Sequence, residues 1–312
     1  MQENLSLAVI IPVFNRRDLI VRALDSVLAQ TCQPGEIIVV DDGSTDDVAD
    51  FLKQEYPMVR CLRQSRAGVS AARNRGIRAS SSQWIALLDS DDSWFPEKLE
   101  RQFEALFSRS KDMTGNETLS DVLPESRICH TDEIWIRDGQ RVNQKSRHKK
   151  HDGWIYRYCL PLCAMSPSSI IIHRSVFDDV GFFDEELPAC EDYDLWLRIC
   201  ARYSVTYVDQ PLLRKYGGHQ DQLSRQYWGM DRFRIIALEK MLNSGVLSEE
   251  DHHSTRQMMQ YKLTILMQGA RKRGKQDDIQ HYSSLMNKYQ LFKNRECQSN
   301  KSGVALQESG GV

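Results

Sequence analysis

Residues 84–96 read WIALLDSDDSWFP, an apolar run that ends in a cluster of carboxylates. The first five residues of the run show no polar alternation, so they predict a strand that is buried on both faces. Asp89, Asp91 and Asp92 follow directly. Like charges this close repel each other, and burial strengthens the repulsion. The stretch therefore predicts a buried strand and a source of positive charge at its carboxyl end.

Similar apolar runs precede this stretch at residues 7–13 and 36–40, a third strand is predicted at 59–64, and a helical segment follows each of the three. Strands of this kind that alternate with helices predict a doubly wound α/β fold, in which helices cover both faces of a parallel sheet. In such a sheet, ligands bind beyond the carboxyl ends of the strands. Polar residues stand at each of these ends, namely Asn15, Asp41, Asp42, Arg66 and the three aspartates. Asn15 is also placed to cap the first helix.

In the second half of the chain, the predicted strands and helices alternate less regularly. Residues 128–142 predict a hairpin that turns at Asp138–Gly139. A helix is predicted over 191–203 and a last strand over 205–208, and the pattern is helical beyond about residue 229. We therefore expect an α/β domain over residues 1–224, a helical extension over 225–292 and a disordered tail over 293–312.

Composition narrows the class of protein. The 312 residues carry a formal net charge of -2, which gives no overall bias toward nucleic acid or an anionic membrane. The eight cysteines form no Cys-x-x-Cys pair, so zinc and redox signatures are missing and a reducing compartment is favoured. The amino terminus lacks the pattern of a signal peptide, and no apolar run approaches the roughly 18 residues that span a bilayer. We expect a cytoplasmic protein and leave peripheral membrane contact open.

Two acidic motifs admit a functional and a structural interpretation. Asp89 and Asp91 offer hard oxygen ligands for Mg²⁺ or Mn²⁺, or they form a solvated turn before the next helix. In VVDDGSTDD, Asp42 can accept hydrogen bonds from a nucleobase or ribose, or the motif caps a helix through Ser44 or Asp46.

Three further motifs are equally open when each is taken alone. In SRAGVSAARNRG, Arg66 and Arg73 suit phosphate oxygens and Gly68 allows close approach, or the helix has an exposed basic face. In EDYDLWLR, Glu191 and Asp192 begin a helix, which suits a catalytic base but also a simple cap. His219 follows two glycines and is either a metal ligand or an ordinary surface residue.

The order of the motifs along the chain is more specific than any one motif alone. IPVFNR, VVDDGSTDD, RAGVSAARNRG, LLDSDDSW and EDYDLWLR follow one another at strand ends and helix starts, and together they closely resemble the family 2 glycosyltransferases over about residues 6–223. The resemblance implies a GT-A fold, an α/β sandwich that binds a nucleotide sugar. It implies inverting, metal-assisted transfer from a nucleoside-diphosphate sugar, most readily a UDP-sugar, to a carbohydrate or lipid-linked acceptor. By analogy, it suggests synthesis of a bacterial-type surface polysaccharide or glycoconjugate.

The resemblance also assigns roles. The DxD motif of the family maps onto Asp89 and Asp91, with Mn²⁺ or Mg²⁺ as cofactor, and Asp192 matches the catalytic base with Glu191 beside it. His219 aligns with a histidine that completes metal coordination in some relatives. The implied nucleotide-sugar-binding residues are Pro12, Phe14, Asn15, Asp42, Arg66, Gly68, Arg73 and Arg214.

Other functions are also considered for these motifs. A nucleotidyltransferase shares a related sheet and binds metal and phosphates, but the Asp192 region argues against it. A non-catalytic scaffold that binds nucleotide sugars is the alternative from another class. The missing G-x-G-x-x-G after the first strand argues against a dinucleotide-dependent oxidoreductase. The basic loop at 143–151 either holds a phosphorylated or lipid-diphosphate acceptor or is simply solvated.

Overall fold

The structure is a computed structural model, and it describes residues 6–108, 124–218 and 227–290. The chain divides into two compact units, Met1–Thr255 and Arg256–Val312. This division lies within helix α10 (Glu249–Lys272), whereas the sequence placed the end of the first domain at residue 224. The domain limits drawn from the sequence stay a prediction.

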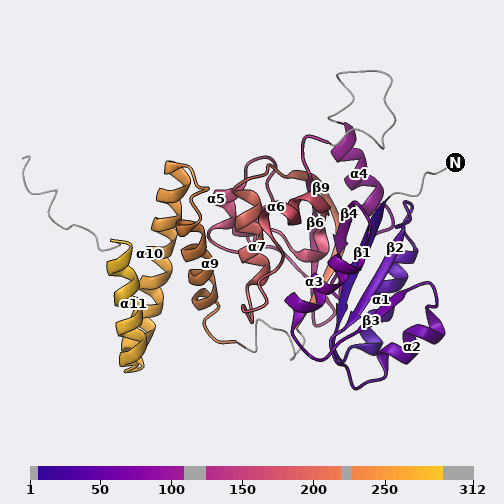
Figure 1. Cartoon of the computed structure of the whole chain (residues 1–312), viewed down its shortest axis with the longest axis horizontal. Coiled ribbons are helices and arrows are strands. Elements are labelled where there is room, and N and C mark those ends of the chain that lie inside the picture. The colour runs from indigo at the N-terminus through magenta and orange to yellow at the C-terminus, as the bar shows by residue number, and fades with distance from the viewer. Residues whose placement is uncertain (1–5, 109–123, 219–226, 291–312) are drawn as a thin grey trace, which may run out of the picture. The chain divides into compact units, whose positions relative to one another are not determined.

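A nine-stranded sheet forms the centre of the first unit, in the order β3-β2-β1-β4-β8-β6-β9-β5, with β7 paired to β6 (Figure 1). Strands β3, β2, β1 and β4 pair in parallel, and the other pairs are antiparallel except for β6 with β9. The strands are β1 (Leu7–Val13), β2 (Glu36–Asp41), β3 (Arg60–Arg63), β4 (Trp84–Leu87), β5 (Ser93–Trp94), β6 (Ile128–Arg137), β7 (Gln140–Val142), β8 (Ile170–His173) and β9 (Thr206–Gly217).

Helices accompany the strands along the chain. Those of the first unit are α1 (Arg17–Leu28), α2 (Val48–Glu55), α3 (Val69–Ala79), α4 (Lys98–Ser108), α5 (Tyr156–Cys159), α6 (Arg174–Val180), α7 (Glu191–Cys200) and α9 (Asp231–Asn243). In the second unit, α10 is followed by α11 (Gln276–Lys288), and the guanidinium of Arg256 donates to the carbonyl of Tyr289 at 2.7 Å. Among the described residues, every helix is too short or too polar to cross a membrane.

Strands β1, β2 and β4 of the parallel half are buried on both faces, as their unbroken apolar runs predict, whereas the edge strand β3 is partly exposed. On one face, Val9 and Val39 join a core cluster that also contains residues of α1, α2 and α4. On the other face, α3 packs on β1 and β2. The approach is so close that a Cβ added at Gly76 would lie 2.4 Å from Cγ2 of Ile10. Only glycine at this helix position allows α3 to lie so near the sheet.

The hairpin prediction is confirmed, because β6 and β7 pair around Asp138–Gly139. Two other expectations differ from the structure. Strand β9 runs on to Gly217, because bulges in its pairing with β6 accommodate Pro211, a residue that normally interrupts a strand. The expected cap is wrong: Arg16 takes the cap position of α1, and the Asn15 side chain instead accepts from the Thr45 amide at 2.7 Å.

Candidate functional site

A cavity of about 690 Å³ opens beyond the carboxyl ends of β1, β2 and β4. This is the location that a parallel α/β sheet favours for ligands. All the predicted site residues except Arg214 and His219 line it, namely Pro12, Phe14, Asn15, Asp42, Arg66, Gly68, Arg73, Asp89, Asp91, Glu191 and Asp192.

The chain itself supplies cations to the acidic cluster. The buried guanidinium of Arg73 bridges Asp89 and Glu191, at 2.7 Å to each carboxylate. Arg16 pairs with Asp91 at 2.8 Å. Burial opposes ionisation of Asp89, but the charge and hydrogen bond of Arg73, together with the charges of Lys215 and Arg16, lower the pKa of that carboxyl. Arginine therefore neutralises part of the charge that the sequence assigned to a metal and a diphosphate.

Lys215 is a further cation of the site that the sequence did not single out. Its side chain lines the cavity, and the charges of Glu133, Asp92 and Asp89 raise its pKa although burial opposes them. Asp92 carries the opposite perturbation, since burial and the charges of Asp91 and Asp89 raise its pKa well above the ordinary range. One wall of the cavity thus combines an ammonium group with crowded carboxyls.

Asp42 organises the loop that follows β3. Its carboxylate accepts from the side chain of Gln64 and from the backbone amides of Ala67 and Gly68, each at 2.8 Å. Next to this loop, the Arg66 guanidinium lies 4.2 Å from the ring centroid of Phe14. The predicted nucleotide-binding residues therefore form a connected wall, on which a flat base or an anionic group can rest.

Asp192 stands in the first turn of α7, which begins at Glu191 as predicted. Its Oδ1 atom accepts from the backbone amide of Tyr193 at 2.7 Å, and its Oδ2 atom lies 3.0 Å from Sγ of Cys163. Burial and the Asp192 charge raise the pKa of Glu191, whereas Arg73 opposes this rise. Both oxygens of Asp192 thus have fixed partners, and the side chain lines the cavity.

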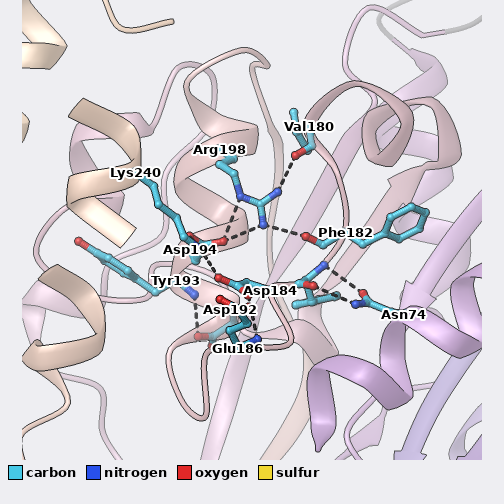
Figure 2. A network of polar contacts seen from close by, with 11 residues as sticks. Asn74, Val180, Phe182, Asp184, Glu186, Asp192, Tyr193, Asp194, Arg198 and Lys240 are labelled. Carbon is cyan, nitrogen blue, oxygen red and sulfur yellow. Dashed lines mark hydrogen bonds and ion pairs between the residues drawn. The ribbon is translucent and has the colours of Figure 1, made fainter. Parts of the chain in front are cut away.

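A polar network holds α7 in place (Figure 2). Buried Asp194 accepts from Arg198 at 2.8 Å and from Lys240 of α9 at 3.1 Å. Arg198 also donates to the carbonyl of Phe182 at 2.8 Å, and Asn74 of α3 accepts from the Phe183 amide at 3.0 Å. The helix that carries Asp192 is therefore tied to α9, to the segment before it and to α3, which fixes the direction of the carboxylate.

Two predicted residues are not brought into the cavity by the described structure. Arg214 points away from the cavity lining, with its guanidinium 4.1 Å from the ring centroid of Phe95, while its neighbour Lys215 faces the cavity. His219 lies outside the described residues. Both assignments stay predictions.

The remaining residues fit a divalent cation in part. Mg²⁺ and Mn²⁺ are commonly bound by one or two carboxylates together with substrate phosphates, and Asp89 and Asp91 both face the cavity. Burial and the charges of Asp91 and Asp89 raise the pKa of Asp92, and a cation would offset the negative charge of these carboxyls. Among the described residues, no group of three or more His, Cys, Asp and Glu side chains could hold a metal ion. The described side chains therefore supply only part of a metal site, and the remaining ligands of a cation would have to come from elsewhere.

Known proteins resemble this chain in sequence. An uncharacterized glycosyltransferase of Rickettsia felis is 29% identical over 252 residues, which cover 78% of this chain and 38% of that protein. TuaG of Bacillus subtilis, a glycosyltransferase assigned to teichuronic acid biosynthesis, is 34% identical over 143 residues, 44% of this chain and 57% of TuaG. The chain thus spans well under half the length of the Rickettsia protein.

The fold also has a solved counterpart. S. aureus TarS residues 1–349, crystallised with UDP-GlcNAc, superposes with a TM-score of 0.62 at 17% identity, over 82% of this chain and 71% of that one. This likeness confirms the predicted GT-A fold. The sequence model described as glycosyl transferase family 2 matches residues 8–177, more than half of the 312 residues. The chain therefore belongs to glycosyltransferase family 2, as its ordered motifs predicted.

Proposed function

We propose that this chain transfers a sugar from a nucleoside-diphosphate sugar to an acceptor hydroxyl, with inversion at the anomeric carbon. One observation carries the proposal: a single cavity joins the Asp192 carboxylate to the cationic side chains of Arg16, Arg66 and Lys215. A carboxylate suits the proton of an acceptor hydroxyl, and the cations suit a diphosphate leaving group. A nucleotidyltransferase has no evident use for the first of these two features.

The residues suggest a single displacement. Asp192 accepts the acceptor's proton as the hydroxyl oxygen bonds to the anomeric carbon. The bond from that carbon to the donor's phosphate oxygen breaks, and the nucleoside diphosphate leaves with the electron pair. Lys215 stabilises the negative charge that develops on it. Arg73 takes no part in proton transfer; it fixes Asp89 and Glu191 in position.

The relatives and the acidic residues of the cavity suggest the donor and the cofactor. TarS has been crystallised with UDP and with UDP-GlcNAc, which supports a UDP-sugar as the donor of this chain. Asp89 and Asp91 would hold Mn²⁺ or Mg²⁺ against the diphosphate, and the metal would supply Lewis-acid stabilisation of the leaving group. The assignment of TuaG to teichuronic acid biosynthesis supports a surface polysaccharide as the destination of the sugar.

Thermal unfolding with a panel of nucleoside diphosphates and nucleotide sugars, with and without Mn²⁺, tests the donor site. A ligand that binds only the native state raises its stability by mass action. We expect a Mn²⁺-dependent rise with uridine nucleotides that Asp91→Asn abolishes and that Asp178→Asn, an exposed control on α6, leaves intact. No rise with any nucleotide would refute the donor site. A rise without sugar transfer to any member of an acceptor pool would favour the scaffold function.

A further inference from the structure

A second cavity, of about 490 Å³, lies outside the donor site. It is bounded by strand β6, strand β7 and the basic segment 143–150. The sequence left open whether this segment binds an anion or is simply solvated, and the proposed function makes no use of it. The contacts of the segment and its charges decide between these interpretations.

The basic segment is anchored on β6. The side chain of Gln144 donates to the carbonyl of Glu133 at 2.7 Å. The His148 ring packs edge-on against Trp135, with centroids 4.8 Å apart. Lys150 is buried, lies 3.4 Å from the Glu133 carboxylate and donates to the carbonyl of Ala164 at 3.0 Å. These contacts make the segment one wall of a formed cavity.

The acidic side chains of this cavity are already engaged. Glu133 accepts from Trp135 at 2.7 Å and also bonds Ser166, besides its pairing with Lys150. Asp209 accepts from the Tyr207 hydroxyl at 3.0 Å. Asp132 is the remaining carboxylate, and the side-chain amide of Gln144 donates to it over 3.5 Å.

Three basic side chains of the cavity, unlike its carboxylates, lack partners among the described residues. Arg141, Lys145 and Lys149 line it and are exposed, and within residues 6–108, 124–218 and 227–290 their side chains have no hydrogen-bond or ion-pair partner. Burial, together with the charges of Arg147, Lys150 and Lys145, lowers the pKa of His148, although Glu133 opposes this shift. The cavity thus presents unpaired positive charge beside an aromatic ring.

The second cavity adjoins the donor site through the sheet. Trp135 of β6 and Lys215 of β9 are register partners, and Trp135 lines the second cavity while Lys215 lines the first. Neighbouring strands lie roughly 5 Å apart, so residues of one strand pair contribute to the walls of both cavities. The Glu133 carboxylate links them further, because both Lys150 and Lys215 lower its pKa, to about 2, against the effect of burial.

We propose that this second cavity binds an anionic group, a phosphate or a carboxylate, that the acceptor carries beside the hydroxyl that reacts. Arg141, Lys145 and Lys149 would hold the anion, since ammonium and guanidinium groups form charge-assisted bonds with such oxygens. A single anionic substituent fits a concave cavity with a buried lysine in its wall better than a flat lipid surface does. The role of the anion as part of the acceptor rests on the proposed function, whereas anion binding itself does not.

Site-resolved lysine acylation of the full chain tests the proposal, with inorganic tripolyphosphate as the probe. UDP and Mn²⁺ are present at saturation, so that the donor cavity is not the measured site. We expect acylation of Lys145 and Lys149 to slow at least threefold, while exposed Lys53 and Lys272 keep their rates. Arg141→Gln should reduce this protection, and Lys53→Gln, the matched control, should not. Unchanged rates, or equal slowing at all four lysines, would overturn the proposal.

Two further measurements distinguish anion binding in the second cavity from membrane binding and from a failure of the donor site. Vesicles of phosphatidylglycerol are tested against vesicles of phosphatidylcholine. Protection of Lys145 and Lys149 by the anionic vesicles alone, without any effect of tripolyphosphate, would overturn the proposal in favour of a membrane surface. Stabilisation by UDP is measured separately in the Arg141→Gln variant, where it should equal that of the wild type. If the wild type is stabilised by UDP but tripolyphosphate leaves its Lys145 and Lys149 unprotected, this inference is overturned and the donor site is left standing.

Discussion

The Sγ atom of Cys163 lies 3.0 Å from Oδ2 of Asp192, the candidate base, and equally 3.0 Å from the carbonyl oxygen of Met165. Burial, followed by the Asp192 charge, raises the pKa of this thiol well above its ordinary value, so it stays protonated and can donate. Together with the amide of Tyr193, the thiol leaves Asp192 little freedom to turn. The geometry thus makes Cys163 a candidate positioning residue for Asp192, the proposed base.

Replacement of Cys163 tests this role. A hydrogen bond contributes about 1 kcal/mol, so we expect Cys163→Ala to lower kcat roughly fivefold with the KM for the donor unchanged. Cys163→Ser should keep most of the activity because its hydroxyl also donates. Steady-state kinetics of the two variants provide the measurement. Equal losses in both would show that packing, and not the hydrogen bond, matters at this position.

Asp192→Asn removes the base but keeps the shape of the side chain. We expect sugar transfer to fall by about 10²- to 10⁴-fold, the usual contribution of general-base catalysis. Donor binding, measured by thermal stabilisation with the nucleotide, should stay near the wild-type value. Asp178→Asn serves as the control on an exposed carboxylate. Turnover close to that of the wild type would remove Asp192 from the role of base.

Buried Arg73 carries two ion pairs at once, one with buried Glu191 and one with partly buried Asp89. Its removal leaves both carboxylates without their partner, so we expect Arg73→Met to lower the free energy of unfolding by roughly 3 to 5 kcal/mol. Arg73→Lys should fall between this variant and the wild type, because an ammonium group lacks the planar fork that bridges both acids.

The matched control for Arg73 is Arg101→Met, which breaks the exposed pair with Glu104. An exposed pair contributes less than about 1 kcal/mol. Urea unfolding of the variants gives the comparison. Similar losses in the buried and the exposed case would contradict a structural role for the Arg73 bridge.

Lys98 provides a test through pH. It is fully buried, donates to Gln102 at 2.7 Å and lies 4.1 Å from the ring centroid of Trp94, and burial lowers its pKa to about 7. Between pH 7 and the ordinary pKa of a lysine, the unfolded chain binds more protons than the folded one. Stability relative to Lys98→Met must therefore rise with pH above 7, by up to about 1.4 kcal/mol per pH unit.

Urea unfolding of the wild type and Lys98→Met at pH 7, 8 and 9 measures this rise. Lys53→Met, at an exposed position on α2, should show no such divergence from the wild type. If the curves of the wild type and Lys98→Met run parallel over this range, Lys98 is not the group that titrates.

The sequence anticipated the elements whose pattern is local. The apolar runs at 7–13 and 36–40 can only be strands buried on both faces, and the helix that starts at Glu191 follows from its own acidic first turn. The sequence predicts only the start of strand β9, because the bulges that accommodate Pro211 lie in β9 and depend on its pairing with β6, which is distant in sequence. Arg214 is assigned from the family resemblance, whereas the structure places its neighbour Lys215 in the cavity wall.

The sequence by itself determined the parallel half of the sheet, the acidic and basic residues at its carboxyl edge and the membership in glycosyltransferase family 2. Only the tertiary structure decided which charges meet. Arg73 is 118 positions from Glu191, and Cys163 is 29 positions from Asp192. Periodicity and capping act over a few residues along the chain, whereas an ion pair depends on distance in space, which is set only when the whole sheet and its helices have packed.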